Sequence, residues 1–140
     1  MGLINSMAIT DSALTAERMQ MDVIANNVAN ANTTRTSSGG PYKAEEVYLT
    51  PANVEAGTQG GLPNAGVQVA AVIEDNSKPR LVYDPSNPGA NRQGYVAYPN
   101  VDPVTETTNM MAAQRAYQAN ITVADDEKAM AMRALDLGRI

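Results

Sequence analysis

The chain has 140 residues, 44% of them hydrophobic and 18% charged, a length that suits one domain or a small domain with an extension. It contains no His and no Cys, so imidazole bases, thiol nucleophiles and disulfides are excluded. Ten basic residues without a basic cluster, in a chain of net charge −5, argue against binding to nucleic acid or to an anionic membrane surface.

No apolar run approaches the ~20 residues of a membrane span. The first basic residue is Arg18, so the positively charged start of a cleaved signal peptide is not expected. Proline and methionine divide the chain into three parts. All eight prolines lie between Pro41 and Pro103, and all eight methionines lie outside that window. Two proline-free arms around a Gly- and Pro-rich middle favour assembly over catalysis.

The first arm predicts a long amphipathic helix that starts with Asn5 or Ser6 as the N-cap and runs to about Asn32. Four Asn between Ala25 and Asn32 indicate either a fraying end or a polar surface for another subunit, and both readings stay open. Two apolar stripes lie on different faces: Met7, Leu14, Met21 and Val28 with Ile24 and Ala31, and Ile9, Ala13, Ala16 and Val23.

The middle of the chain predicts a small β module of short strands separated by turns. The clearest alternation is that of Val67, Val69, Ala71 and Ile73. The glycines of Pro51–Gly66 suggest a mobile excursion. The expected strands are Lys43–Leu49, Val67–Ile73, Leu81–Tyr83 and Tyr95–Tyr98, with a loop at Thr33–Gly40 and a turn at Asp84–Gly89.

The second arm predicts a longer helix, with Asp102 as the N-cap, Pro103 at the first helical position and Gly138 at the end. At roughly 35 residues it outreaches the first helix, so its extra length must contact something else or fray. Met110, Tyr117, Ala124 and Ala131 repeat by seven with Ile121 and Leu135 between them, and Ala113, Ala116, Val123, Met130 and Leu137 mark a second face.

Candidate catalytic and metal-binding groups are few. The acidic runs Glu45–Glu46, Glu74–Asp75 and Asp125–Glu127 place their carboxylates at adjacent positions, where side chains diverge. Solvated surface is therefore the favoured interpretation of each run. Methionines can bind soft metals, but the mixed spacings here favour adaptable packing. We expect no catalytic residue, no cofactor and no metal.

Several segments resemble the flagellar axial proteins, the secreted subunits that polymerise into rod, hook and filament. Val23–Thr33 is similar to the Asn-rich signature near the N-termini of rod and hook proteins, and Arg115–Ile121 is similar to their second signature. The resemblance covers essentially the whole chain, except Thr50–Gly66 and Asp125–Glu127. Four segments of this chain resemble one short rod protein of the family in particular. They are Gly40–Tyr42, Arg80–Pro85, Gly94–Val101 and Ala134–Arg139.

The predicted fold is α+β, with two long terminal helices packed as an antiparallel, coiled-coil-like pair and a small inserted β module. The expected division is an N-terminal helical arm at 1–34, an outer β module at 35–101 and a C-terminal helical arm at 102–140. The expected assembly interface lies on both arms and comprises Met7, Leu14, Met21, Ile24, Asn26, Asn27, Val28, Asn30, Met110, Tyr117, Asn120, Ile121, Val123, Met130, Leu135 and Leu137.

The resemblance implies a structural subunit of the proximal rod, exported unfolded through the flagellar type III apparatus and assembled in the periplasm. The implied neighbours are the rod proteins FlgB, FlgF and FlgG, the junction protein FliE and copies of the chain itself. A soluble coiled-coil adaptor or secretion chaperone is the rival hypothesis. An enzyme acting on peptidoglycan is disfavoured because His and a convincing acid–base pair are missing.

Overall fold

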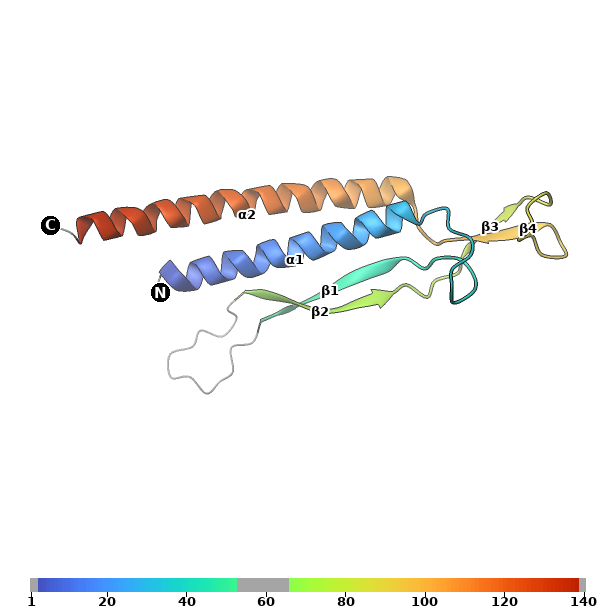
Figure 1. Ribbon diagram of the computed structural model, residues 1–140, viewed down its shortest axis with the longest axis horizontal. Helices are drawn as coiled ribbons and strands as arrows, with labels where there is room; N and C mark the ends of the chain where they lie inside the picture. The colour runs from blue at the N-terminus through green and yellow to red at the C-terminus, as the bar shows by residue number, and fades with distance from the viewer. Residues whose placement is uncertain (1–2, 53–65, 139–140) are drawn as a thin grey trace.

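The computed structural model describes residues 3–52 and 66–138, so most of the loop expected at Pro51–Gly66 lies outside the described residues. Two helices dominate it, α1 (Leu3–Ala29) and α2 (Pro103–Leu137). They lie side by side and antiparallel, with both chain ends at the same end of the molecule (Figure 1). The 35 residues of α2 extend past the 27 of α1. The predicted α+β fold with an antiparallel helix pair is confirmed.

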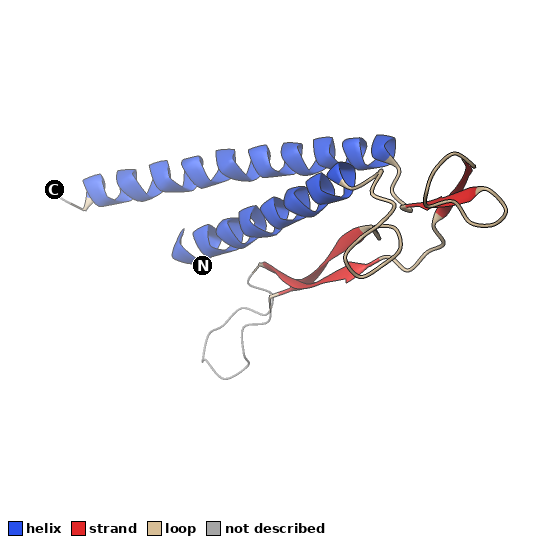
Figure 2. Ribbon diagram, turned by 45° about the vertical axis from the view of Figure 1, so that its right-hand side comes forward, coloured by secondary structure: helices blue, strands red, loops and turns tan. Residues whose placement is uncertain are grey.

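Within the described residues, four strands form two separate antiparallel hairpins rather than one sheet. The first pairs β1 (Glu45–Pro51) with β2 (Val67–Glu74), and the second pairs β3 (Arg80–Tyr83) with β4 (Tyr95–Tyr98). The β1–β2 hairpin packs along α1, on the side away from α2, whereas β3–β4 projects beyond the end at which α1 stops and α2 starts (Figures 1 and 2). The molecule is therefore elongated.

The bounds of α1 differ from the prediction at both ends. The helix already includes Asn5 and Ser6, so a cap at either residue is wrong. It ends at Ala29 instead of Asn32 because Asn side chains take local hydrogen bonds that compete with the helix. The Asn30 Nδ2 donates to the carbonyl of Asn26 at 3.0 Å, and the Thr33 hydroxyl donates to Asn30 Oδ1 at 3.1 Å.

The start of α2 agrees with the prediction. The Asp102 carboxylate accepts from the backbone N–H of Val104 at 3.1 Å and from the hydroxyl of Thr105 at 2.8 Å. Pro103 stands at the first helical position, where its missing N–H has no intrahelical role. At the far end, the N–H of Gly138 donates to the carbonyl of Ala134 at 3.2 Å, which caps the helix there.

The apolar core sits at the junction between the helices and the hairpins. Ala31, Ala44 and Val101 are buried against one another, and Tyr42 packs on this cluster. Because these side chains are mostly small, the junction buries little apolar area. Hydrogen bonds between polar groups therefore contribute much of what fixes the geometry of the junction.

Candidate assembly interface

Asn27 joins α1 to β1 and to α2 through every polar atom of its amide. Its Oδ1 accepts from the backbone N–H of Glu45 at 2.9 Å and from the Tyr42 hydroxyl at 3.0 Å. Its Nδ2 donates to the Glu45 carbonyl at 2.9 Å and to the Glu106 carboxylate at 3.4 Å. The side chain is only 2% exposed, so this is a buried amide with all its donors and acceptors in use.

The hydroxyl of Tyr42 is held in its protonated, donating form. Burial raises the pKa of this phenol, and the negative charges of Glu45, Glu106 and Glu74 raise it further. Since a deprotonated Tyr42 could not donate to Asn27, the surrounding carboxylates stabilise the hydrogen bond that closes the junction.

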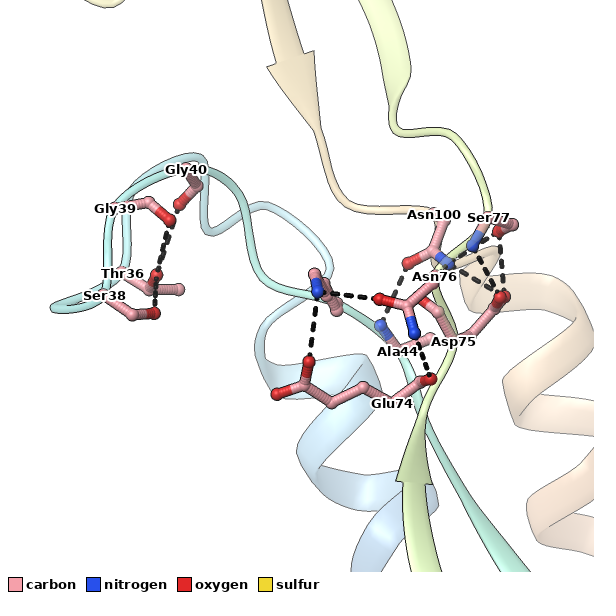
Figure 3. A network of polar contacts seen from close by, with 11 residues as sticks. Thr36, Ser38, Gly39, Gly40, Ala44, Glu74, Asp75, Asn76, Ser77 and Asn100 are labelled. Carbon is pink, nitrogen blue, oxygen red and sulfur yellow. Dashed lines mark hydrogen bonds and ion pairs between the residues drawn. The ribbon is translucent and has the colours of Figure 1, made fainter.

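Asn100 makes a second polar link, between the strand ends and the segment that leads into α2 (Figure 3). Its Oδ1 accepts from the N–H of Ala44 at 2.9 Å, while its Nδ2 donates to the Asp75 carboxylate and to the Ser77 hydroxyl, both at 2.8 Å. The N–H of Asp75 donates in turn to the Ala44 carbonyl at 2.7 Å. The backbone at the start of the β1–β2 hairpin is thus held by hydrogen bonds to both Asn27 and Asn100.

The Asp75 carboxylate is stabilised as an anion by the same network. The backbone N–H and the hydroxyl of Ser77, with a further contribution from Asn100, lower the pKa of Asp75 below its usual value. Outside this network, Lys43 forms an exposed ion pair with Glu74 at 3.1 Å and donates to Asn76 at 2.8 Å.

The seam between the helices is narrow and partly polar. Along α2, side chains that are buried or half-buried recur at alternating spacings of four and three residues, the pattern of a coiled-coil seam. Three positions of this seam are polar, and several others are alanine, so the helices gain little apolar burial from each other. The seam residues are Glu106, Met110, Ala113, Tyr117, Asn120, Ala124, Glu127 and Ala131.

Large apolar side chains remain uncovered elsewhere on α2. Leu135 and Leu137, on the length of α2 that overhangs α1, are 71% and 75% exposed. A run of exposed apolar residues along one element is typical of a surface that contacts another molecule. The others on this helix are Val104, Met111, Ile121, Val123, Met130 and Met132.

The predicted interface residues fall into three groups. Ile24 and Asn27 are buried within the chain, so in this conformation they are not available to a neighbour. Leu14, Met21, Asn30, Met110, Tyr117 and Asn120 are half-buried. Met7, Asn26, Val28, Ile121, Val123, Met130, Leu135 and Leu137 are exposed.

The seven-residue repeats alone do not identify the seam. Ile121 and Leu135, which accompany the repeat of Met110, Tyr117, Ala124 and Ala131, are exposed, whereas Asn120 is half-buried and Glu127 is buried. The interpretation of Asp125–Glu127 as solvated surface is wrong for Glu127, which is 6% exposed. The seven-residue spacing from Ala113 through Asn120 to Glu127 is the signal that reveals it, although polar residues obscured the pattern.

Within residues 3–52 and 66–138, no group of three or more acidic side chains is placed to hold a metal ion. In the same part of the chain, neither helix is apolar enough over sufficient length to cross a membrane.

Two family models match the chain. The family described as flagella basal body rod protein matches residues 7–35, which include all but the first four residues of α1. The family described as the C-terminal part of flagellar basal body rod FlgEFG proteins matches residues 92–137, which include α2. The matched regions are thus the two helices and the segments joined to them.

Curated relatives match over nearly the whole length. The flagellar basal-body rod protein FlgC of Salmonella typhimurium is 43% identical over 139 residues, and that of Escherichia coli O6:H1 is 42% identical over 139 residues. The FlgC of Bacillus subtilis is 39% identical over 150 residues. Each alignment covers 99% of this chain and 100% of the relative. The chain therefore belongs to the FlgC family of flagellar basal-body rod proteins.

Proposed function

We propose that this structural rod protein, which is not an enzyme, polymerises through its terminal helices into the helical tube that serves as the drive shaft of the flagellum. The observation that carries the proposal is the uncovered apolar surface of α2, above all Leu135 and Leu137 on its overhang. Contacts between unlike surfaces of neighbouring subunits build an open helical polymer when the rotation from one subunit to the next does not close into a ring. Long helices packed near the axis would give such a tube the stiffness that torque transmission needs.

The neighbours that we propose are the rod proteins FlgB, FlgF and FlgG, the junction protein FliE and copies of this chain, met in the part of the rod that spans the periplasm. The flagellar type III apparatus would deliver the subunit. We further propose that residues 1–34 and 102–140 form the inner layer of the tube and that 35–101 face outward. The position of β1–β2 on the side of α1 away from α2 supports this division.

Exchange of the overhang residues tests the proposal. In flagellated cells, replacement of Leu135 and Leu137 together by Ser should lower the amount of the chain in purified basal bodies by at least about tenfold. Burial of one leucine contributes about 1.5–3 kcal/mol, and 1.4 kcal/mol is a tenfold change in affinity. Replacement of both by Met, which keeps the apolar surface, is the matched control and should assemble like the parent.

Both variants should be exported in equal amounts, because each changed side chain is largely exposed in the single chain. If the serine variant assembled normally, the overhang would not be an interface. The rival role, a soluble adaptor or secretion chaperone, predicts a stable dimer of the purified chain in sedimentation. The rod proposal predicts a monomer or an open-ended polymer.

A further inference from the structure

Glu127 is a buried residue whose carboxyl group has an unpaired oxygen in the part of the chain that the structure describes. The residue is 6% exposed, and its Oε2 has no hydrogen-bond partner among residues 3–52 and 66–138. Burial of an acidic group is costly when no hydrogen bond or opposite charge compensates for it. A position of this kind in the seam calls for an explanation, since alanine at the same site would avoid the cost.

A hollow of about 380 Å³ opens beside this carboxyl, between the first turns of α1 and the second half of α2. Its lining is mostly apolar, from Met7, Leu14 and Ala124, and a second acidic residue, Asp11, stands on its wall. We call this hollow, lined by Met7, Ala8, Asp11, Leu14, Ala124 and Glu127, the acidic socket.

The residues that line the acidic socket favour a ligand that carries a positive charge at the end of an apolar stem. A small metal ion is a poor fit, because two carboxyl groups among apolar side chains offer too few ligands. Arginine and lysine place several methylene groups behind their charge, so their stems can lie along Met7 and Leu14 while the head reaches the carboxyls. Arginine pairs with carboxylates in a planar, bidentate geometry and keeps its charge at any physiological pH.

The chain itself carries a suitable cation on the outer surface of α2. Arg115, Lys128 and Arg133 are exposed there and form no ion pair within the described parts of the chain. Lys128 follows Asp125 by three positions and Arg133 precedes Asp136 by three, where helical neighbours of opposite charge attract each other. Arg115 alone among them has no acidic residue three or four positions away on either side.

We propose that the acidic socket of one subunit receives Arg115 of a second copy of this chain. The same chain cannot supply it, because Arg115 and Glu127 stand on one straight helix about 18 Å apart at 1.5 Å per residue. The socket and Arg115 lie on different surfaces, so the contact is head-to-tail and leaves a free socket and a free arginine at the two ends of any row of subunits. This inference rests on the proposed assembly.

Cysteine cross-linking tests the contact in assembled basal bodies, and the absence of cysteine from the native chain keeps the background clean. Two forms of the chain with tags of different size are produced in the same flagellated cells. One carries Met7→Cys at the rim of the socket, and the other carries Met111→Cys, one helical turn from Arg115. A short bismaleimide should link the two forms. As the matched control, Met7→Cys with Met132→Cys, which is also exposed on α2, should give at least about fivefold less product.

Charge exchange gives the second readout. Glu127→Arg and Arg115→Glu should each lower incorporation into basal bodies about tenfold or more, and the two together should restore it to at least half of the parental amount. Glu127→Gln, a milder change, should lower incorporation severalfold, whereas Asp126→Asn on the neighbouring exposed position should not.

The outcomes separate this inference from the proposed function. If the parent chain is absent from basal bodies, the rod assignment itself fails. If the parent assembles but the Met7–Met111 product is missing, or if Glu127→Gln assembles as well as Asp126→Asn, only the socket contact is overturned. A link from Met7 to a different protein would show that another subunit fills the socket, and would likewise overturn the choice of a second copy.

Discussion

Asn27 and Asn100 both form hydrogen bonds with the same short stretch of backbone. Asn27 holds the N–H and the carbonyl of Glu45, and Asn100 holds the N–H of Ala44. An amide is suited to this role because one short side chain offers both donors and acceptors. Where the core consists of alanine and valine, such directional bonds fix an arrangement that apolar packing alone would leave loose.

Asn27→Ala should destabilise the chain by about 2–4 kcal/mol, because it leaves the buried N–H of Glu45 and the hydroxyl of Tyr42 without their partner. Asn26→Ala changes an exposed amide one position away and should cost less than about 0.5 kcal/mol. Urea unfolding, followed by tyrosine fluorescence because the chain has no Trp, measures both. Equal destabilisation by the two changes would contradict the role assigned to Asn27.

The junction also makes stability sensitive to high pH. The pKa of Tyr42 is raised in the folded chain. The protonated phenol therefore contributes its full share to the free energy of unfolding below the usual value of 10.0, and this share is lost as the pH rises through the raised pKa. Tyr42→Phe removes the titrating group and the hydrogen bond together, so the variant should be less stable at pH 7 and should lose less stability than the parent above pH 10. Thermal unfolding at several pH values checks this, and parallel alkaline curves would refute it.

Helix and strand boundaries can be predicted from the sequence where they depend on residues that are close together in the chain. Asp102 and Pro103 specify the start of α2 through their immediate neighbours, and the alternation around Val67–Ile73 specifies a strand. The role of Asn27 is different, because its partners Glu45 and Glu106 are remote in the sequence. An Asn-rich segment looks the same whether its amides face solvent, another subunit or this junction.

The seam of α2 shows the same limit. A search for large apolar residues at seven-residue spacing selects Ile121 and Leu135, which the structure exposes, and does not select Glu127, which the structure buries. In an isolated globular protein the large apolar residues would occupy the seam between the helices. In a subunit that meets several neighbours, the largest apolar side chains can be reserved for those contacts instead, so apolar periodicity alone does not identify the inner face.

The cap of α2 should be sensitive to acid. The Thr105 hydroxyl and the Val104 N–H lower the pKa of Asp102, so the stabilisation by its carboxylate is fully present above the usual value of 3.8 and is lost as the pH falls through the lowered pKa. Asp102→Ala should therefore lower the midpoint of thermal unfolding by a few degrees at pH 7, with little difference from the parent near pH 2.5. Asp126→Ala, an exposed change in the same helix, serves as the control. An undiminished difference near pH 2.5 would argue against a charged cap.

Order is distributed unevenly over the whole molecule. The buried cluster, the hydrogen bonds of Asn27 and Asn100, and the cap of α2 lie at one end, where α1 stops and α2 starts. Towards the other end the seam contains Glu127, the acidic socket is open, and α2 continues alone. The end that is held by the chain's own contacts thus differs from the end that offers surfaces to neighbours.

This arrangement predicts a gradient of hydrogen exchange in the free subunit. Amides near the junction, such as those of Ala44 and Glu45, should be the most protected, and protection along both helices should fall towards Met7 and Leu135, because helices draw most of their stability from packing. In assembled basal bodies the distal turns should become protected, since neighbours then cover them. Exchange measured by mass spectrometry on both forms tests the gradient, with the junction as the internal control. Uniform protection of α1 and α2 in the free chain would mean that the helices are complete before assembly, and the cost of ordering them would then not regulate polymerisation.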